Sequence, residues 1–249
     1  PEKTERKDGG RDIMCPSSLV KGDNAMNVPR HVAVILDGNG RWAKSKGMPR
    51  NYGHAQGSKN VERICEDAYR MGVSILRYMR FPRRTGPAPR RRSPPDGLIV
   101  EFFNKKIDEL DKKGVCIRML GDLRQVPELQ RKTAEAAMAR TAHNAGLKLN
   151  IALNYGSRRR SCAPRASLPK SAATGRCGPE DIDENAFEDA LYTRGLPPVD
   201  LLIRTSGEER LSNFLLYQCA YAEFLFVPEF WPDFTRESLR GRSRRTSAV

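Results

Sequence analysis

The chain has 249 residues, enough for one domain with a sizeable core, and it carries a formal net charge of +14. A large positive net charge is typical of proteins that bind nucleic acid or an anionic membrane, but here the excess of basic residues is confined to a few segments. Seventeen of the 44 bases fall in three segments that contain no acid, residues 77–95, 157–178 and 238–249, and the other 27 bases face 30 acids. The charge therefore does not define the whole chain as a nucleic-acid binder.

The cysteines and the apolar runs indicate the cellular compartment. The six cysteines include no Cys-x-x-Cys pair and no zinc-like spacing with histidine, so we expect no disulfide framework. No apolar run reaches transmembrane length, and no signal peptide with an apolar centre is present. We therefore expect a cytoplasmic protein. Residues 1–26 are polar and are predicted to form a disordered N-terminal extension, with Met14 or Met26 as a candidate start.

Taken in chain order, apolar runs alternate with helical patterns. Helical periodicity is expected at 53–71, 98–113, 127–145 and 183–192, and residues 215–223 are also helix-like. Strands are expected at 32–36, 73–78, 115–120, 147–154, 200–203 and 224–227. This alternation predicts an α/β fold, with a central, mostly parallel six-stranded sheet flanked by helices in a single domain at 27–240.

The first expected strand ends in a group of residues suited to a diphosphate. The sequence there is Asp37-Gly38-Asn39-Gly40-Arg41-Trp42. Gly38 and Gly40 let backbone N–H groups approach an anion closely, and Arg41 adds a cation with fork geometry. Asp37 is placed to meet a metal or a phosphate at the carboxyl edge of the sheet. The same tetrapeptide also makes an ordinary turn, and Asp37 could simply end a strand.

A second group follows the strand expected at 200–203. Arg204, Arg210 and Ser212 can bind another diphosphate, and Glu223 ends the helix-like stretch that comes next. Arg50 and His54, between the two groups, add further bases. The duller interpretations are that Glu223 pairs with a nearby arginine and that His54 caps a helix. Together these interpretations leave two anion-binding groups unexplained.

These residues resemble the cis-prenyltransferase family, or isoprenyl transferases, whose bacterial type is undecaprenyl diphosphate synthase. The resemblance covers about 28–77, 98–156 and 179–237. It implies that an allylic diphosphate such as farnesyl diphosphate binds at Asp37, Gly38, Asn39, Gly40, Arg41, Trp42, Arg50 and His54. It also implies that isopentenyl diphosphate binds at Arg204, Arg210 and Ser212, and that Mg²⁺ is held by Asp37 and Glu223, with Asp37 catalytic.

The resemblance further implies a long-chain polyprenyl diphosphate product, a homodimer with its contact near residues 209–223, and peripheral membrane contact through the lipid product. Trp42 and Tyr52 could line the substrate pocket or pack against the sheet. The aromatic residues Phe224, Phe226, Phe230 and Trp231 are expected in the core or at a subunit interface.

Three segments depart from the family pattern, at about 75–96, 158–178 and 238–249. In the first, the family has a Ser/Thr-Glu-Asn-Trp loop that helps to bind the allylic substrate, whereas this chain is rich in arginine and proline. Starting each codon at the preceding wobble base permits the reading YLTVYAFSTENW from residue 75, an amphipathic helix from residue 158 and AYQRR at residues 245–249. We therefore hypothesise that these segments, including a basic tail at 241–249, are frame-shifted translation.

Two alternatives follow from these segments. The chain could be a non-catalytic or decayed prenyltransferase homologue, or, if the arginine stretches are genuine, a basic RNA-binding protein. We expect no detectable catalysis by the chain as written, because no residue of 79–92 supplies the chemistry of the missing loop.

Overall fold

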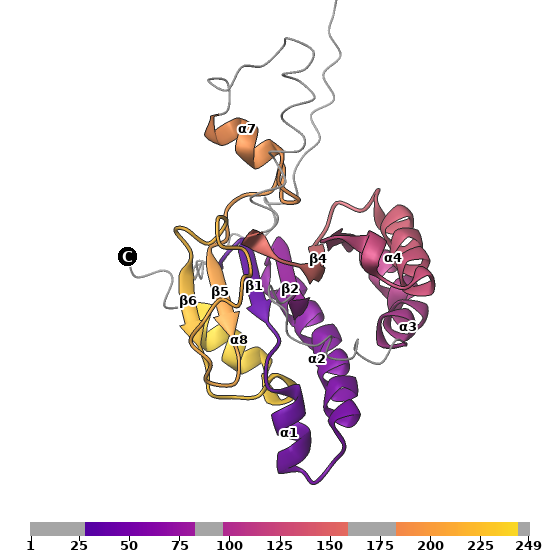
Figure 1. The fold of residues 1–249 in the computed structure, drawn as a ribbon, viewed down its shortest axis with the longest axis vertical. Helices are drawn as coiled ribbons and strands as arrows, with labels where there is room; N and C mark the ends of the chain where they lie inside the picture. Colours follow the sequence, from indigo (N-terminus) through magenta and orange to yellow (C-terminus); the bar gives the residue numbers. More distant parts are fainter. Residues whose placement is uncertain (1–27, 83–96, 159–182, 244–249) are drawn as a thin grey trace, which may run out of the picture.

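The computed structural model describes residues 28–82, 97–158 and 183–243. Its centre is a six-stranded, all-parallel sheet with the strand order β3-β4-β2-β1-β5-β6 (Figure 1). The strands are β1 (His31–Ile35), β2 (Ile75–Pro82), β3 (Cys116–Leu120), β4 (Lys148–Tyr155), β5 (Leu201–Arg204) and β6 (Glu223–Phe226). The predicted fold class, with its six strands and flanking helices, is confirmed.

Each of the predicted helical ranges 53–71, 98–113, 127–145 and 183–192 contains a helix with shifted ends, and two further helices of the described residues lie outside these ranges. The helices are α1 (Asn39–Ser45), α2 (Arg50–Met71), α3 (Leu98–Lys112), α4 (Glu128–Thr141), α7 (Glu184–Asp189) and α8 (Arg236–Ser243), with short 3-10 turns η1 (Leu123–Gln125) and η3 (Trp231–Asp233). The prediction of a helix-like stretch at 215–223 is wrong: this segment forms turns, and Leu215 has a φ of +47° that no α-helix contains. None of the helices in the described ranges is long and apolar enough to span a bilayer.

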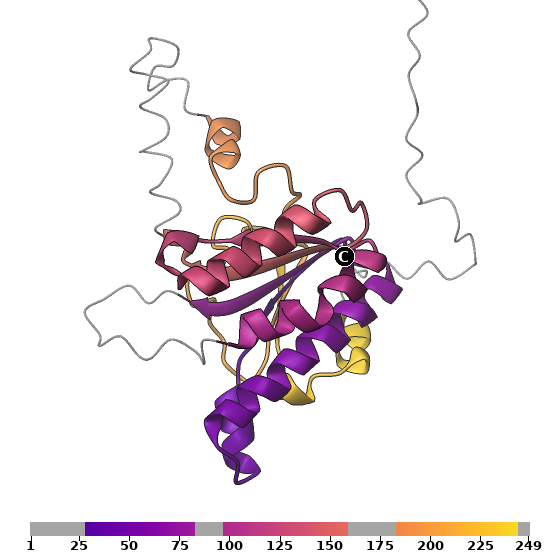
Figure 2. The same ribbon diagram turned by 90° about the vertical axis from the view of Figure 1, so that its right-hand side faces the viewer.

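The two faces of the sheet bury separate cores. Figure 2 shows α2, α3 and α4 together over one face, where Val34, Leu76 and Leu149 are fully buried. On the other face Ala33, Ala152 and Leu202 pack in a cluster with residues of the segment 211–222. Burial of strands on both faces explains why their sequences are nearly continuous apolar runs, as in other parallel sheets.

One fully buried residue breaks this pattern. Arg77 of β2 is 0 % exposed, and none of its three guanidinium nitrogens has a hydrogen-bond partner among the described residues. The register pairs Arg77 with Ala33 on one side and Asn150 on the other, so its side chain shares their face of the sheet. Burial lowers the pKa of Arg77 to about 10. Arg77 is therefore a buried cation without a counter-charge in the described core.

Arg77 lies in the first segment that we interpret as frame-shifted. Residues 75–82 of that segment form β2, whose backbone hydrogen bonds do not depend on side-chain identity. Residues 83–96, most of the segment at 158–178, and the extension at 1–26 lie outside the described residues. The tail predicted at 241–249 begins inside α8, which ends at Ser243, and its remainder also lies outside them.

Candidate active site

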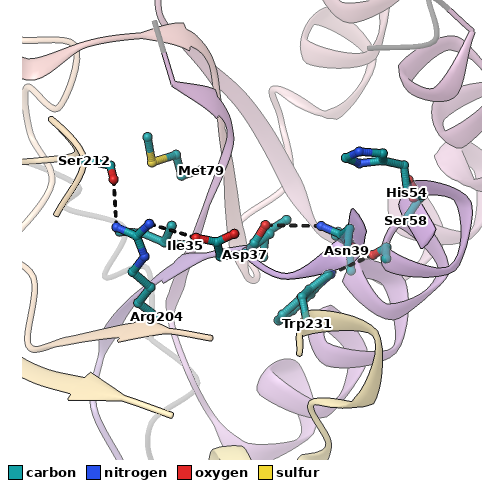
Figure 3. Close-up of a pocket in the computed structure, with 12 residues that line it drawn as sticks. Ile35, Asp37, Asn39, His54, Ser58, Met79, Arg204, Ser212 and Trp231 are labelled. Carbon is teal, nitrogen blue, oxygen red and sulfur yellow. Dashed lines mark hydrogen bonds and ion pairs between the residues drawn. The ribbon is translucent and has the colours of Figure 1, made fainter. Parts of the chain in front are cut away.

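The candidate site lies where the chain order of the sheet reverses. From β1, the chain fills one side of the sheet with β2, β4 and β3, and it returns to the other side with β5 and β6. In open α/β sheets, ligands bind outside the carboxyl ends of the strands at such a point. Ile35 pairs with Arg204, the last residue of β5, and Asp37 follows two positions later. Both Asp37 and Arg204 line a cavity of about 210 Å³ (Figure 3).

Arg204 joins the two predicted groups. Its side chain is 3 % exposed, and its Nη2 donates to Asp37 Oδ2 at 2.8 Å. Its Nη1 donates to Ser212 Oγ at 2.7 Å and to the carbonyl of Arg210, and its buried Nε has no partner among the described residues (Figure 3). Residues 167 positions apart in sequence thus meet through one guanidinium.

Asp37 is held as a carboxylate. Burial pushes its pKa upward, but hydrogen bonds from Arg204 and from the Gly38 N–H at 2.7 Å, with the charges of Arg204 and Arg41, bring the pKa below its usual value. Its side chain is still 31 % exposed. Asp37 is therefore ionised at neutral pH and retains an open side.

Gly38 is required by the backbone at this point. It has a φ of +95° and precedes α1, and a Cβ built on it would lie 2.6 Å from the ring of Phe230. An L-residue would be strained in this conformation and would also collide with that ring. The glycine of the predicted anion-binding group therefore has a structural explanation in addition to its proposed closeness to substrate.

A network of ion pairs extends from Asp37. Arg41 pairs with Glu208 Oε1 at 2.9 Å, lies 3.6 Å from Asp37 Oδ1 and donates to Ser206 Oγ at 2.5 Å. Glu208 also pairs with Arg210, whose side chain is 59 % exposed. The carbonyl of Arg210 therefore contacts Arg204, whereas its guanidinium pairs with Glu208 and does not line the cavity. An incoming anion would compete with Glu208 for both arginines.

The other predicted residues divide into two groups. Asn39 and His54 line the cavity with Asp37 (Figure 3). Arg50 begins α2 beside Gly40, where an added Cβ would lie 3.2 Å from Arg50 Nε. Trp42 does not line the cavity: it stacks on Tyr52, with ring centroids 6.0 Å apart, and its Nε1 donates to Asp233.

The predicted pairing of Glu223 with Asp37 in one metal site is not formed within this chain. Glu223 is the first residue of β6 and pairs with Leu201, the first residue of β5, so it lies at the amino edge of the sheet. Asp37 lies beyond the carboxyl edge, on the order of 15 Å away along the strand direction.

Sequence reasoning missed the apolar wall of the cavity. Ile35, Leu36, Val61, Met79 and Trp231 line it beside the charged groups. Leu36 and Val61 also line an adjoining narrow void, which is otherwise bounded by the side chains of Tyr78, Phe102, Phe103, Met119 and Ile151. Ile35 and Leu36 were expected only as part of a strand, and Trp231 was expected in the core or at a subunit interface. A charged head beside a hydrocarbon wall suits a ligand with the same two parts.

The loop after β5 stores backbone strain. Ser206, Ser212, Asn213 and Leu215 have φ values of +76°, +50°, +65° and +47°. Such left-handed residues other than glycine cost free energy and gather at functional sites. Here they bring Ser212 and the carbonyl of Arg210 back onto Arg204.

Fold and site together define an α/β protein with an apolar-walled cavity, lined also by Asp37, Arg204 and Ser212, at a switch point of a parallel sheet. Comparison with known proteins narrows this class. A family model described as "Putative undecaprenyl diphosphate synthase" matches residues 35–242. An isoprenyl transferase of Clostridium perfringens is 43 % identical over 214 residues, which cover 86 % of this chain and 85 % of that protein.

Two further similar proteins point to the same family. A ditrans,polycis-undecaprenyl-diphosphate synthase of Micrococcus luteus, described as (2E,6E)-farnesyl-diphosphate specific, is 41 % identical over 217 residues, 87 % of each chain. The solved structure of lavandulyl diphosphate synthase from Lavandula x intermedia, in complex with dimethylallyl diphosphate, superposes with a TM-score of 0.82 at 30 % identity and covers 89 % of this chain and 96 % of that one. The chain belongs to the isoprenyl transferase family, a family of prenyl-transferring enzymes whose reaction is cis-prenyl chain elongation.

Proposed function

We propose that this site condenses isopentenyl diphosphate with an allylic diphosphate, such as farnesyl diphosphate, to form a long-chain polyprenyl diphosphate. The observation that carries the proposal is the Asp37–Arg204–Ser212 contact in an apolar-walled cavity. The guanidinium of Arg204 contacts both groups of residues that are proposed to bind diphosphates. Two diphosphates would therefore be held side by side, with their carbon chains against the apolar wall of the cavity.

The residues divide the work in the following way. Asp37, Asn39, Arg41, Arg50 and His54 face the allylic diphosphate, with the backbone N–H groups at Gly38 and Gly40. Arg204, Ser212 and Arg210 hold isopentenyl diphosphate, for which Arg210 must turn from Glu208. The allylic C–O bond breaks and negative charge gathers on the departing diphosphate, where the arginines stabilise it. The double bond of isopentenyl diphosphate then attacks, and loss of a proton leaves a cis alkene.

Magnesium fits this site through Asp37. Among residues 28–82, 97–158 and 183–243, no group of three or more His, Cys, Asp or Glu side chains could hold a metal ion. A hard divalent cation that keeps several waters can nevertheless be held by one carboxylate and the oxygens of a diphosphate. Asp37 offers that carboxylate, ionised and open on one side. When bound, Mg²⁺ would neutralise charge on the departing diphosphate.

We place the proposed homodimer contact at the edge strand β6. Tyr221 is 97 % exposed, Phe224 of β6 is 46 % exposed, and Leu216 is 42 % exposed. An edge strand with exposed aromatic side chains requires cover, and a second copy supplies it. Glu223 lies in the same surface, so its contribution to the site would be made through this interface. Membrane contact through the lipid product remains part of the proposal.

The chain as written lacks the Ser/Thr-Glu-Asn-Trp loop after β2. We therefore propose that it binds diphosphates at the described cavity but turns over only after the three frame-shifted segments are restored. Incorporation of labelled isopentenyl diphosphate into polyprenyl product measures this. Turnover by the chain as written, at the rate of the restored chain, would contradict it.

Binding is tested directly with inorganic pyrophosphate and Mg²⁺ by calorimetry. Arg204→Ala removes charge-assisted bonds worth about 1.5–3 kcal/mol each, so affinity should fall at least about tenfold. The matched control is Arg118→Ala, because Arg118 is an exposed arginine of β3 outside the cavity, and it should bind as the wild type does. Equal affinity in the Arg204 and Arg118 variants would overturn the assignment of the site.

A further inference from the structure

The turn η3 connects three elements of the candidate site. The Trp231 N–H donates to the carbonyl of Asp37 at 3.0 Å, and the Trp231 indole Nε1 donates to the carbonyl of Gly57 in α2 at 2.8 Å. Trp42 Nε1 of α1 donates to Asp233 Oδ1 at 2.8 Å. The end of β1, the first helix and the second helix therefore all depend on the position of this turn.

The turn is itself held by a side chain that lies outside the cavity. Asn60 of α2 is 4 % exposed, and its Nδ2 donates to the carbonyls of Trp231 and, at 3.0 Å, Phe234. One amide group thus bonds both ends of the turn. Asn60 Oδ1 has no partner among the described residues, and burial of an unpaired oxygen costs free energy. The favourable contribution of this buried amide therefore comes from its Nδ2 donor.

The contacts form one stripe along α2. Gly57, Asn60 and Arg63 are spaced three residues apart, which puts them on one face of the helix. Gly57 accepts from Trp231, Asn60 donates to Trp231 and Phe234, and Arg63 Nη2 donates to the carbonyl of Phe234 at 2.9 Å. Gly57 also permits close packing, because an added Cβ would lie 3.0 Å from Trp231 and 1.9 Å from Asn39.

We propose that Asn60 is a positioning residue for the diphosphate site: it holds η3, and η3 holds the backbone of Asp37. Thr205 Oγ1 also donates to the Asp37 carbonyl, at 2.8 Å, so the carbonyl is fixed from β5 and from η3 together. Without Asn60, the carbonyls of Trp231 and Phe234 each lose one donor and keep one, the Phe234 N–H at 3.2 Å and Arg63 Nη2 at 2.9 Å, so the turn is held less tightly. Asp37, Asn39 and the Trp231 wall would then shift relative to Arg204. The effect on ligand binding rests on the proposed function, whereas the structural connection does not.

The test compares Asn60→Leu with Asn60→Asp and with Gln130→Leu. Asn60→Asp keeps the shape but replaces the donor with an acceptor, so it should behave as Asn60→Leu does. Gln130 is a buried amide on α4, remote from η3, and its replacement controls for general loss of stability. The chain has only two tryptophans, Trp42 and Trp231, and both bond to this region, so their fluorescence reports on the turn.

In both Asn60 variants we expect emission at longer wavelength, stronger acrylamide quenching, and affinity for magnesium pyrophosphate about fivefold to tenfold weaker than in wild type. Gln130→Leu should lower the melting temperature and leave both readouts unchanged. Unchanged fluorescence in both Asn60 variants, or equal losses of affinity in the Asn60 and Gln130 variants, would overturn the proposal. If the wild-type chain binds no pyrophosphate, the proposed function fails, and the fluorescence comparison alone decides the role of Asn60 in holding the turn.

Discussion

Replacing Arg77 with threonine should make the protein more stable. The side chain is fully buried in the centre of the sheet with three unpaired guanidinium nitrogens. Burial lowers its pKa from 12.5 to about 10, which corresponds to about 3 kcal/mol of unfavourable free energy for the charged form. Replacing a buried ion pair with well-packed hydrophobic residues of similar volume is neutral or stabilises other proteins by about 1–4 kcal/mol, and Arg77 lacks even the partner that such a pair has.

For a domain of this size, 1 kcal/mol changes the melting temperature by about 2–4 °C, so Arg77→Thr should raise it by about 6–12 °C. Differential scanning calorimetry or circular dichroism measures the shift. Arg77→Met, which fills more of the same space without charge, should raise the melting temperature as well. Both variants need only a folded protein, so the measurement does not depend on catalytic activity.

Arg118 provides a matched control. Asn150 pairs with Arg77 on one side and with Arg118 of β3 on the other, so the two arginines occupy equivalent positions in the sheet. Arg118 is exposed, and Arg118→Thr should change the unfolding free energy by less than about 0.5 kcal/mol. If Arg77→Thr and Arg77→Met lower the melting temperature, the guanidinium has a counter-charge in the folded protein and the reasoning is wrong. The codon reading shifted by one base places threonine at position 77, so a stabilised variant also supports the frame-shift hypothesis.

Three other measurements follow from the structure. Burial, with the charge of Arg77, lowers the pKa of His31 to about 4, so between about pH 6.5 and pH 4 His31 binds a proton in the unfolded chain but not in the folded chain. The free energy of unfolding measured in urea should therefore be up to about 3 kcal/mol lower at pH 4 than at pH 7. The loss should be smaller in Arg77→Thr. The pKa of Asp37 lies below its usual value of about 3.9, so the stability that its ionised form adds is complete above that pH and is lost as the pH falls through the folded pKa. Asp37→Asn should remove this acid dependence and should also weaken the binding of magnesium pyrophosphate at neutral pH. An unchanged affinity would contradict the proposed role of Asp37. Gly57→Ala would place a Cβ 1.9 Å from Asn39 Oδ1 and should destabilise the protein by about 1–3 kcal/mol in chemical denaturation. In the control Gly97→Ala the added Cβ meets nothing within 4 Å, so this variant should have little effect. Equal effects of the two substitutions would show that the contact between α1 and α2 relaxes freely.

The sequence predicted the part of the site that depends on strand ends. Asp37 and Arg204 follow apolar runs, and in a parallel sheet the carboxyl ends of strands share one edge, so their meeting could be anticipated. The central strands were predictable because they are buried on both faces, whereas the edge strand β6 is partly exposed. Asn39 and Ser212 were also found from their place in the two groups and His54 from its place between them, and all three line the cavity.

The remaining features depended on loop conformation. Residues 215–223 contain helix-favouring side chains, but the left-handed backbone at Leu215 and its neighbours prevents a helix, so Glu223 begins a strand at the opposite edge. The role of Asn60 was invisible because its partners are backbone carbonyls 171 and 174 residues later in the chain. The orientation of Arg210 toward Glu208 reflects a local ion pair that composition does not reveal.

The order of strands in the sheet has a consequence for synthesis. β1 is made first, but its neighbour β5 is made about two-thirds of the chain later, so one side of Val32–Ile35 has no partner while the ribosome is still working. Such an open, apolar edge invites pairing with other nascent chains. A ribosome that stops before residue 201 would release a product with that edge uncovered, and we expect such truncated products to aggregate.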